Sequence, residues 1–169
     1  MSGGSSGSLL PLSMRALWLL AVLLGGCSLV SSDPAEIGFG AEVPTALEAD
    51  LTFRGRSVAL TDEQPTTAGP LRYAEPAEVA AGAATVGCTV RTAGGDGAAA
   101  TAALDLDLES GWRYGVTGRT AETDPADLCF GCRGSTSVAL DPALGLPADQ
   151  RLWLVWFGDP KDAAPEAKE

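Results

Sequence analysis

The chain has 169 residues, with 22 acidic and 11 basic side chains and a formal net charge of −11 at pH 7. A protein this acidic is a poor partner for nucleic acid phosphates and for anionic lipid headgroups. It contains no histidine, which excludes Ser-His-Asp and Cys-His nucleophiles and histidine-ligated zinc or haem. We therefore expect a protein that is not an enzyme and that uses no cofactor and no metal.

An apolar segment near the N-terminus has the layout of an export signal. Arg15 precedes the apolar run from Ala16 to Leu24, and small residues lead on to Cys27. The run is too short for a transmembrane helix, which needs about 20 apolar residues, and it fits a secretory signal. A buried helix is the alternative, but the run lacks polar positions at a period of 3.6 residues. Met14 makes a more typical start than the Ser/Gly-rich leader of residues 1–13.

The four residues Leu24-Gly25-Gly26-Cys27 resemble the lipobox of bacterial lipoproteins. This resemblance implies cleavage before Cys27, with lipid on both its sulfur and its new amino group. It predicts a signal peptide over residues 1–26, a membrane partner reached through the lipid on Cys27, and a location in the bacterial cell envelope. Ser28 follows the cysteine in place of an aspartate, which favours the outer membrane in a cell that has two membranes.

The remaining chain divides by its periodicity into three parts. Residues 27–49 have no sustained apolar period and predict a lipidated flexible tether, with docking of Ile37 and Phe39 onto the domain as the alternative. Residues 50–158 contain short segments of alternating apolar and polar residues, which predict a β-sandwich domain. Residues 159–169 are mainly Pro, Ala, Lys and Glu and predict a disordered charged tail.

The alternating segments predict six or seven strands. Residues 61–76 carry three prolines and predict a loop, with a short strand over 71–73 as the alternative. Ala77 to Ala84 could begin a strand or form a short helix. The glycine-rich run from Gly94 to Gly97 predicts a tight hairpin turn, because glycine adopts positive φ angles at little cost.

The strand that follows this turn has one apolar and one acidic face. Leu104, Leu106 and Leu108 alternate with acidic residues, so that the leucines share one face of a strand. The acids on the other face are Asp105, Asp107 and Glu109. Side chains two residues apart on a strand stand roughly 6.6 Å apart, too far to share one calcium ion without loops. We interpret the acids as a solvated face.

Residues 108–116 resemble the E–F corner of fibronectin type III domains. The matching positions are Leu108, Gly111, Tyr114 and Val116. Ser110 and Trp112 depart from the pattern, and an ordinary hairpin is the alternative. The resemblance implies an all-β fold, an Ig-like or fibronectin type III-like β-sandwich, in which the Tyr114 hydroxyl bonds to backbone upstream. A small open barrel or a transthyretin-like sandwich also fits the pattern.

Cys129 and Cys132 form a Cys-x-x-Cys pair. A strand is predicted after it, over residues 135–140, so the helix that lowers a thioredoxin-type thiol pKa is absent. With Cys27 lipidated, an odd number of thiols remains in an oxidising compartment. We predict a disulfide between Cys129 and Cys132, with Cys88 bonded to one of them as the alternative. Zinc would need a fourth ligand other than histidine.

The last predicted strand, from Arg151 to Gly158, is apolar on both faces, whereas a two-layer sandwich buries only one. Either a loop covers the second face or aromatic side chains are exposed to a ligand. The candidate ligand surface is formed by Trp153 and Trp156, with Trp112. The sequence thus favours a lipid-anchored, non-catalytic interaction module with an envelope protein or glycan as partner. A thiol-based redox or metal-handling lipoprotein that uses Cys129 and Cys132 is the alternative function.

Overall fold

The computed structural model describes residues 33–96 and 99–162. The predicted signal peptide, the predicted lipidation site Cys27 and the tail residues 163–169 lie outside the described residues. Within the described part of the chain, no helix is long and apolar enough to cross a membrane.

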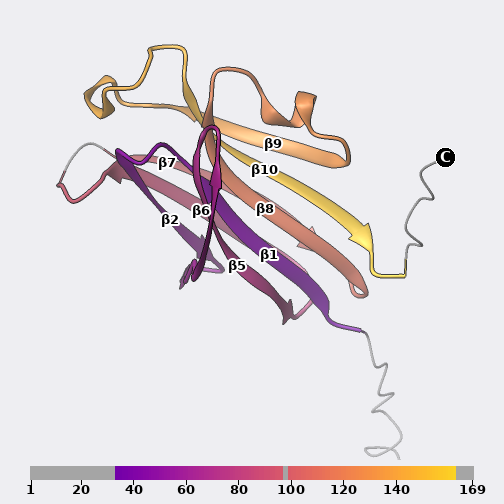
Figure 1. Cartoon of the computed structure of the whole chain (residues 1–169). Coiled ribbons are helices and arrows are strands. Elements are labelled where there is room, and N and C mark those ends of the chain that lie inside the picture. Colours follow the sequence, from indigo (N-terminus) through magenta and orange to yellow (C-terminus); the bar gives the residue numbers. More distant parts are fainter. Residues whose placement is uncertain (1–32, 97–98, 163–169) are drawn as a thin grey trace, which may run out of the picture. The chain divides into compact units, whose positions relative to one another are not determined.

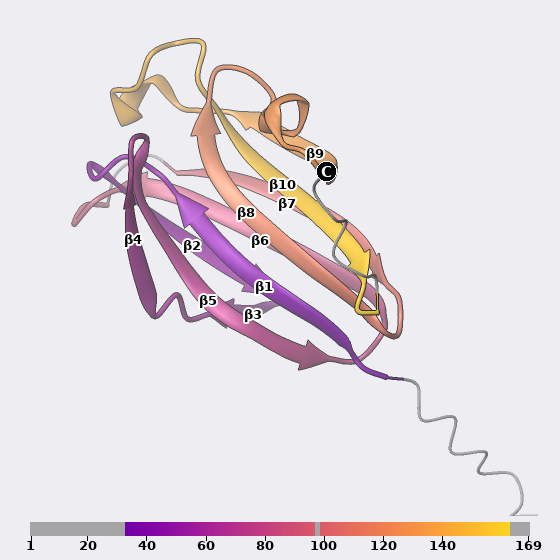
Figure 2. The ribbon, with the colours of Figure 1, turned by 45° about the vertical axis from the view of Figure 1, so that its right-hand side comes forward.

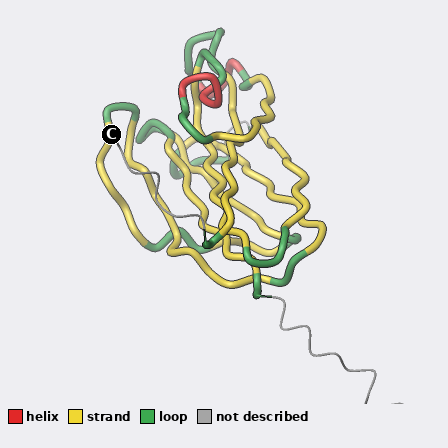
Figure 3. Tube along the Cα trace, turned by 90° about the vertical axis from the view of Figure 1, so that its right-hand side faces the viewer, coloured by secondary structure: helices red, strands yellow, loops and turns green. Residues whose placement is uncertain are grey.

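The described residues form an all-β sandwich, as predicted from the sequence (Figures 1 and 2). In spatial order, the larger sheet contains β4 (Asp62–Thr66), β5 (Gly69–Val79), β1 (Ala35–Glu42), β8 (Trp112–Ala121), β10 (Arg151–Pro160) and β9 (Cys132–Ala139). The smaller sheet contains β3 (Arg56–Val58), β2 (Leu47–Phe53), β6 (Gly82–Thr92) and β7 (Ala100–Leu108). Two short 3₁₀ helices, η1 (Pro125–Leu128) and η2 (Pro142–Leu144), lie toward one end of the strands (Figure 3).

Strand β1 lies in the interior of the larger sheet, antiparallel to β5 and parallel to β8. Ile37 is 0% exposed, and Phe39 is buried with it. The prediction of a flexible tether over residues 27–49 is therefore wrong from Ala35 onward, and β2 also begins inside that range, at Leu47. The physical reason is the alternation of large and small residues along β1, which gives the segment one apolar face to bury.

The strand pattern corrects two further predictions and decides one alternative that the sequence left open. Residues 61–76 are not a loop, because β4 and β5 form an antiparallel hairpin there. Pro65 is tolerated because β4 is an edge strand, where a missing N–H costs no ladder bond. No helix forms at residues 77–84, where β5 ends and β6 begins. The described residues form ten strands where six or seven were expected.

The predicted disordered tail also begins too early. Strand β10 runs through Asp159 to Pro160, both of which pair with β8. The Lys161 ammonium then donates a 2.7 Å hydrogen bond to the Pro34 carbonyl oxygen. This bond fixes the end of β10 beside the start of β1, so the ordered domain extends beyond both ends of the predicted range 50–158.

The connection from β7 to β8 carries the tyrosine hydrogen bond that the fibronectin-like resemblance implied. The Tyr114 hydroxyl accepts from the Glu109 backbone N–H at 2.9 Å, and Gly111 makes the turn with a φ of 75°. Because β7 and β8 belong to different sheets, this hydrogen bond of the buried tyrosine holds the connection where the chain passes from one sheet to the other. Along β7, Leu106 and Leu108 are buried and the intervening Asp107 is exposed, as predicted.

The core lies between the two sheets and is built from their inward-facing side chains. Its fully buried large members are Ile37, Leu51, Leu108, Leu152, Leu154, Val86, Val90 and Val116. Cys88 packs among them where β8 has Gly118, since a Cβ at that glycine would come within 2.6 Å of the Cys88 sulfur. Interiors packed this closely respond to the loss of single methylene groups.

A pair of phenylalanine substitutions tests the placement of β1. Phe39→Ala should lower the free energy of unfolding by about 3–5 kcal/mol, because it removes a buried ring from the core. The matched control is Phe130→Ala, at a side chain that is 99% exposed, and it should change stability by less than about 0.5 kcal/mol. Urea denaturation of the two variants and of the wild type measures both changes in the free energy of unfolding. Equal, small effects would mean that residues 35–42 are not part of the core.

Candidate functional site

The larger sheet has an outer face that points away from the smaller sheet. The register between β1 and β8 pairs buried Ile37 with buried Tyr114, which places both on the inner face. The next pair, Gly38 with Gly115, must then face outward, as must Gly40 with Thr117. The middle of the outer face therefore has little side-chain bulk.

These small residues form the floor of an apolar groove with a volume of about 320 Å³. One wall consists of Leu71, Tyr73 and Pro76 from β5, and the opposite wall is Phe157 of β10. We call this the outer groove, with a floor of Gly38, Gly40, Gly115 and Thr117. Backbone without side chains lets another molecule approach a sheet closely.

Phe157 takes its position from Gly115 on the neighbouring strand. The two residues are directly paired in the sheet, and a Cβ at Gly115 would collide with the Phe157 ring. The ring therefore lies flat against the Gly115 backbone, and it remains 41% exposed. A glycine thus both forms the floor and orients the wall.

Two ion pairs flank the groove along β1 and β8. Glu36 pairs with Arg113 at 3.4 Å and Glu42 pairs with Arg119 at 3.3 Å. Glu42 also accepts a 2.6 Å hydrogen bond from the Thr66 hydroxyl. Glu75 also lines the groove, and it has no basic partner within 4.0 Å among the described residues. The groove therefore carries one unpaired carboxylate beside these two ion pairs.

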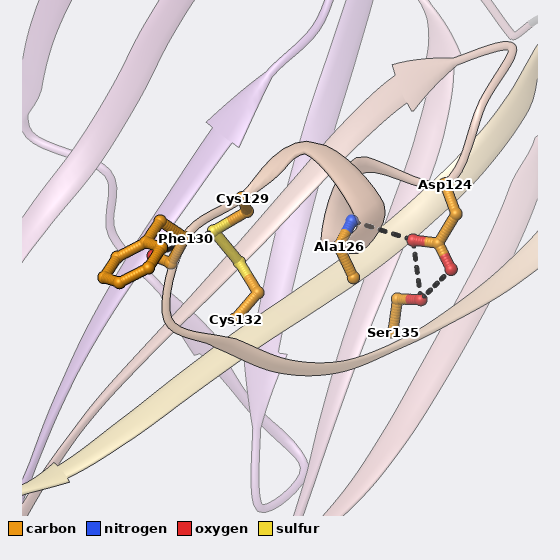
Figure 4. Close-up of a disulfide and its surroundings, with 6 residues drawn as sticks. All are labelled: Asp124, Ala126, Cys129, Phe130, Cys132 and Ser135. Atoms are coloured by element: carbon orange, nitrogen blue, oxygen red, sulfur yellow. Dashed lines mark hydrogen bonds between the residues drawn. A yellow bond between two sulfur atoms is a disulfide. The ribbon is translucent and has the colours of Figure 1, made fainter.

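Figure 4 shows the disulfide loop, residues 124–132, which precedes β9. Its cysteines lie beside Glu42 and Arg119, at one end of the groove. Cys129 and Cys132 are disulfide-bonded, as predicted. The Asp124 carboxylate accepts hydrogen bonds from the Ala126 N–H at 2.8 Å and from the Ser135 hydroxyl at 2.8 and 2.6 Å. Ser135 belongs to β9, so the Asp124 carboxylate ties the base of the loop to the sheet at this hydroxyl. The cysteines share a second hollow, of about 260 Å³, with Phe157 of the groove wall.

The tip of this loop exposes two large apolar side chains. Phe130 is 99% exposed and Leu128 is 81% exposed. Within the described ranges, Phe157 is the other large apolar residue in the exposed class, and it lines the outer groove. Leu128 lines a separate small hollow that includes Arg119 and Cys129. Isolated exposed apolar residues are common on proteins, but a cluster next to a groove marks an interaction surface.

The predicted tryptophan surface does not form as one surface. Trp153 lies on the outer face, where its indole N–H donates to the Ala121 carbonyl oxygen at 3.1 Å. Trp156 packs with Tyr114 on the inner face, and Trp112 stacks on the same tyrosine. All three tryptophans are half-buried. The exposed apolar side chains beside the groove are instead Phe130, Leu128 and Phe157.

The third cysteine does not join the disulfide. Cys88 is a free, buried thiol in the core, so the alternative pairing of Cys88 with Cys129 or Cys132 is wrong. Burial, and secondarily the Asp50 carboxylate, raises the pKa of the Cys88 thiol to about 12. A thiol with so high a pKa is almost entirely protonated at neutral pH and is a weak nucleophile.

The surroundings of the disulfide differ from those of a thioredoxin-type pair. The short helix η1 ends before Cys129, and Cys132 begins strand β9, so neither sulfur lies at the N-terminus of an α-helix. Among the described residues, no group of three or more His, Cys, Asp or Glu side chains is placed to hold a metal ion. The disulfide closes a short ring of four residues, in which the Phe130 side chain is exposed.

Reasoning from the sequence missed the outer groove. The signal was present in β1, where Gly38 and Gly40 alternate with large residues, but Gly-Phe-Gly was interpreted as part of a flexible segment. The contribution of Gly115 could not be read from β8 alone, because its role depends on Phe157 of the adjacent strand.

Comparisons with models of known protein families, with curated proteins and with solved structures found no match.

The buried thiol makes stability depend on alkaline pH. The unfolded thiol loses its proton near its ordinary pKa of 9.0, whereas the folded one holds it to about 12. The protonated thiol therefore contributes fully to the free energy of unfolding below about pH 9. This contribution falls between about pH 9 and pH 12, by up to ~1.4 kcal/mol per pH unit. Denaturation of wild type and Cys88→Ala at pH 8 to 11 should show the steeper loss in wild type. Parallel curves would contradict a buried thiol at this position.

Proposed function

We propose that the protein is a lipid-anchored, non-catalytic binding module of the bacterial cell envelope, and that its outer groove and disulfide loop hold a protein partner. The observation that carries the binding role is the mainly apolar groove next to the disulfide loop with its exposed Phe130 and Leu128. The proposed location in the envelope rests on the lipobox-like residues Leu24-Gly25-Gly26-Cys27.

Three features support a location in the envelope. Arg15 and the following apolar run fit an export signal. The Cys129–Cys132 disulfide is of a kind that persists in oxidising compartments and is rare in the cytosol. The net charge of −11 opposes direct adhesion to anionic membranes, so attachment would come from acyl chains, of which more than one gives stable anchoring.

The chemistry of the groove favours a protein partner over a glycan. Sugars are gripped by aromatic faces together with many polar side chains, whereas the walls here are mainly Leu71, Pro76 and Phe157, to which Tyr73 adds one hydroxyl. The charged side chains beside the groove bond one another, with Glu75 as the exception. Leu128 adds an aliphatic contact to the aromatic Phe130. Buried apolar anchors with a polar rim are typical of protein interfaces.

The disulfide loop is preorganised for such a contact. A ring closed between Cys129 and Cys132, with Asp124 bonded to Ser135, holds Phe130 near one position before any partner arrives. Binding then costs less conformational entropy than it would for a free loop. The exposed Phe130 side chain would enter a pocket on the partner.

Metabolic labelling tests the anchor. The full chain, expressed in a bacterium with labelled palmitate, should carry label and sediment with membranes. Cys27→Ser should lose both properties, because it removes the sulfur and the cleavage-site cysteine. The Cys129→Ser/Cys132→Ser variant is the matched control and should keep its label. Label on Cys27→Ser, or none on the wild type, would contradict lipidation at Cys27.

Photo-cross-linking in intact host cells tests the binding face. A photoreactive phenylalanine analogue at Phe130 should give a discrete protein adduct, and the same analogue at Tyr73 in the groove wall should capture the same protein. The control position is Thr101, exposed on β7 of the smaller sheet, which should give no such adduct. A carbohydrate adduct would favour a glycan, and equal adducts at Thr101 would argue against the outer groove.

A further inference from the structure

A second site lies at the open edge of the sandwich, where β3 ends one sheet and β5 lies near the edge of the other (Figure 2). A hollow of about 470 Å³ separates these strands. Its apolar lining comes from Phe53, Val58 and Val79, which pack against the core. Arg54 and Arg56 also line it. This hollow shares no lining residue with the outer groove.

The two arginines have no ion-pair partner among the described residues, and in this they resemble Arg72 and Arg151. Acidic side chains outnumber basic ones by 22 to 11, and the ion pairs among the described residues use Arg91, Arg113, Arg119 and Arg133. Neither Arg54 nor Arg56 has a carboxylate within 4.0 Å in the described part of the chain. Glu78, the residue before Val79, lies opposite Glu36 in the register of β5 with β1, on the outer face of the larger sheet. The hollow is thus a local positive site.

Arg54 is held there at a cost in backbone conformation. It forms a two-residue turn with Gly55 between β2 and β3, and both residues have positive φ, 48° and 75°. Asparagine is the usual first residue of such a turn, and arginine is rare. Strain of this kind persists where the surrounding structure holds it, often at functional sites.

The strained turn fixes the Arg54 guanidinium at the rim of the hollow. Its Nη2 donates to the Ala80 carbonyl oxygen at 2.8 Å, and its central carbon lies 5.0 Å from the centre of the Phe53 ring. A guanidinium has five N–H donors, so most remain available. Arg56 makes no side-chain hydrogen bond or ion pair with a described residue, and its pairing with Phe53 places both on the same face of the hairpin.

We infer that this hollow binds an amphipathic anion, namely a phosphate or carboxylate group attached to a short apolar chain. The anionic group would bond the guanidiniums of Arg54 and Arg56, and the apolar part would lie on Phe53, Val58 and Val79. Guanidinium bonds to anions are the stronger, charge-assisted kind. An inward charge also discourages edge-to-edge pairing of strands, but that role requires neither the strained Arg54 nor an apolar hollow.

Calorimetry of the soluble domain, begun at Ser28, tests this site with octyl phosphate as the probe. Octyl phosphate should bind, inorganic phosphate at least tenfold more weakly, and octanol not measurably. Arg54→Asn and Arg56→Gln should each weaken octyl phosphate about tenfold, as expected for loss of one charged hydrogen-bond partner. The control is Arg91→Gln, whose guanidinium is already paired with Asp50 at 2.6 Å, and it should bind as wild type.

The melting temperature separates a binding role from a structural one. Asparagine tolerates positive φ, so Arg54→Asn should leave the melting temperature unchanged or raise it. A clear fall would identify Arg54 as a structural staple and would overturn the inference. Undiminished binding to the Arg54→Asn/Arg56→Gln double variant would overturn it as well, as would equal affinity for inorganic phosphate.

Vesicles distinguish the two sources of the anion. If the site takes a lipid headgroup, the domain should bind phosphatidylglycerol vesicles but not phosphatidylcholine vesicles, and the double variant should lose this binding. Binding to octyl phosphate alone identifies a free amphipathic acid. Either result supports the site, whereas no binding to either probe refutes it.

Discussion

The parallel pairing of β1 with β8 is the interaction on which the rest of the larger sheet depends. Strand β5 reaches β8 only through β1, so this pairing joins the β4–β5 hairpin to the strands that follow it in the sheet. The same strand supplies Ile37 and Phe39 to the core and Gly38 and Gly40 to the outer groove. Folding and site formation therefore rest on one alternation of large and small residues.

Glycines on β8 give the larger sheet its two different surfaces. Gly118 faces inward and admits the Cys88 side chain, which closes the core. Gly115 faces outward and supports the Phe157 ring, which forms a groove wall. The buried Cys88 thiol and the open groove thus arise from the same device, a missing Cβ opposite a larger neighbour. At Gly118 the missing Cβ lets a side chain fill the core, and at Gly115 it leaves apolar surface accessible on the outer face.

Local patterns predicted those features whose cause is local. The alternation along β7, the turn at Gly94 and the short Cys129–Cys132 ring each depend on neighbouring residues, and each is present in the structure. Strand β1 was taken for a tether because its glycines weaken the apolar signal, although Ile37 and Phe39 keep a period of two. Strand β4 is hard to predict because of Pro65, which is tolerated there at the edge of the sheet.

The candidate site was harder to predict because it combines distant segments. Leu71, Gly38, Gly115 and Phe157 come from four strands, and no sequence interval reports that they share a face. The three tryptophans looked like a surface because they are large and aromatic, yet the register divides them between faces. Strand order, which the sequence left open, decided which aromatic side chains are exposed.

The central claim is that the outer groove and the disulfide loop form the binding face in the envelope. Hydroxyl-radical footprinting of the anchored protein in isolated envelopes, compared with the purified domain, tests it most directly. The account predicts that Phe130, Leu128 and Tyr73 lose reactivity in envelopes, while Trp112 on the inner face is unchanged. If Phe130 and Tyr73 react equally in both preparations, no partner covers this face and the claim is contradicted.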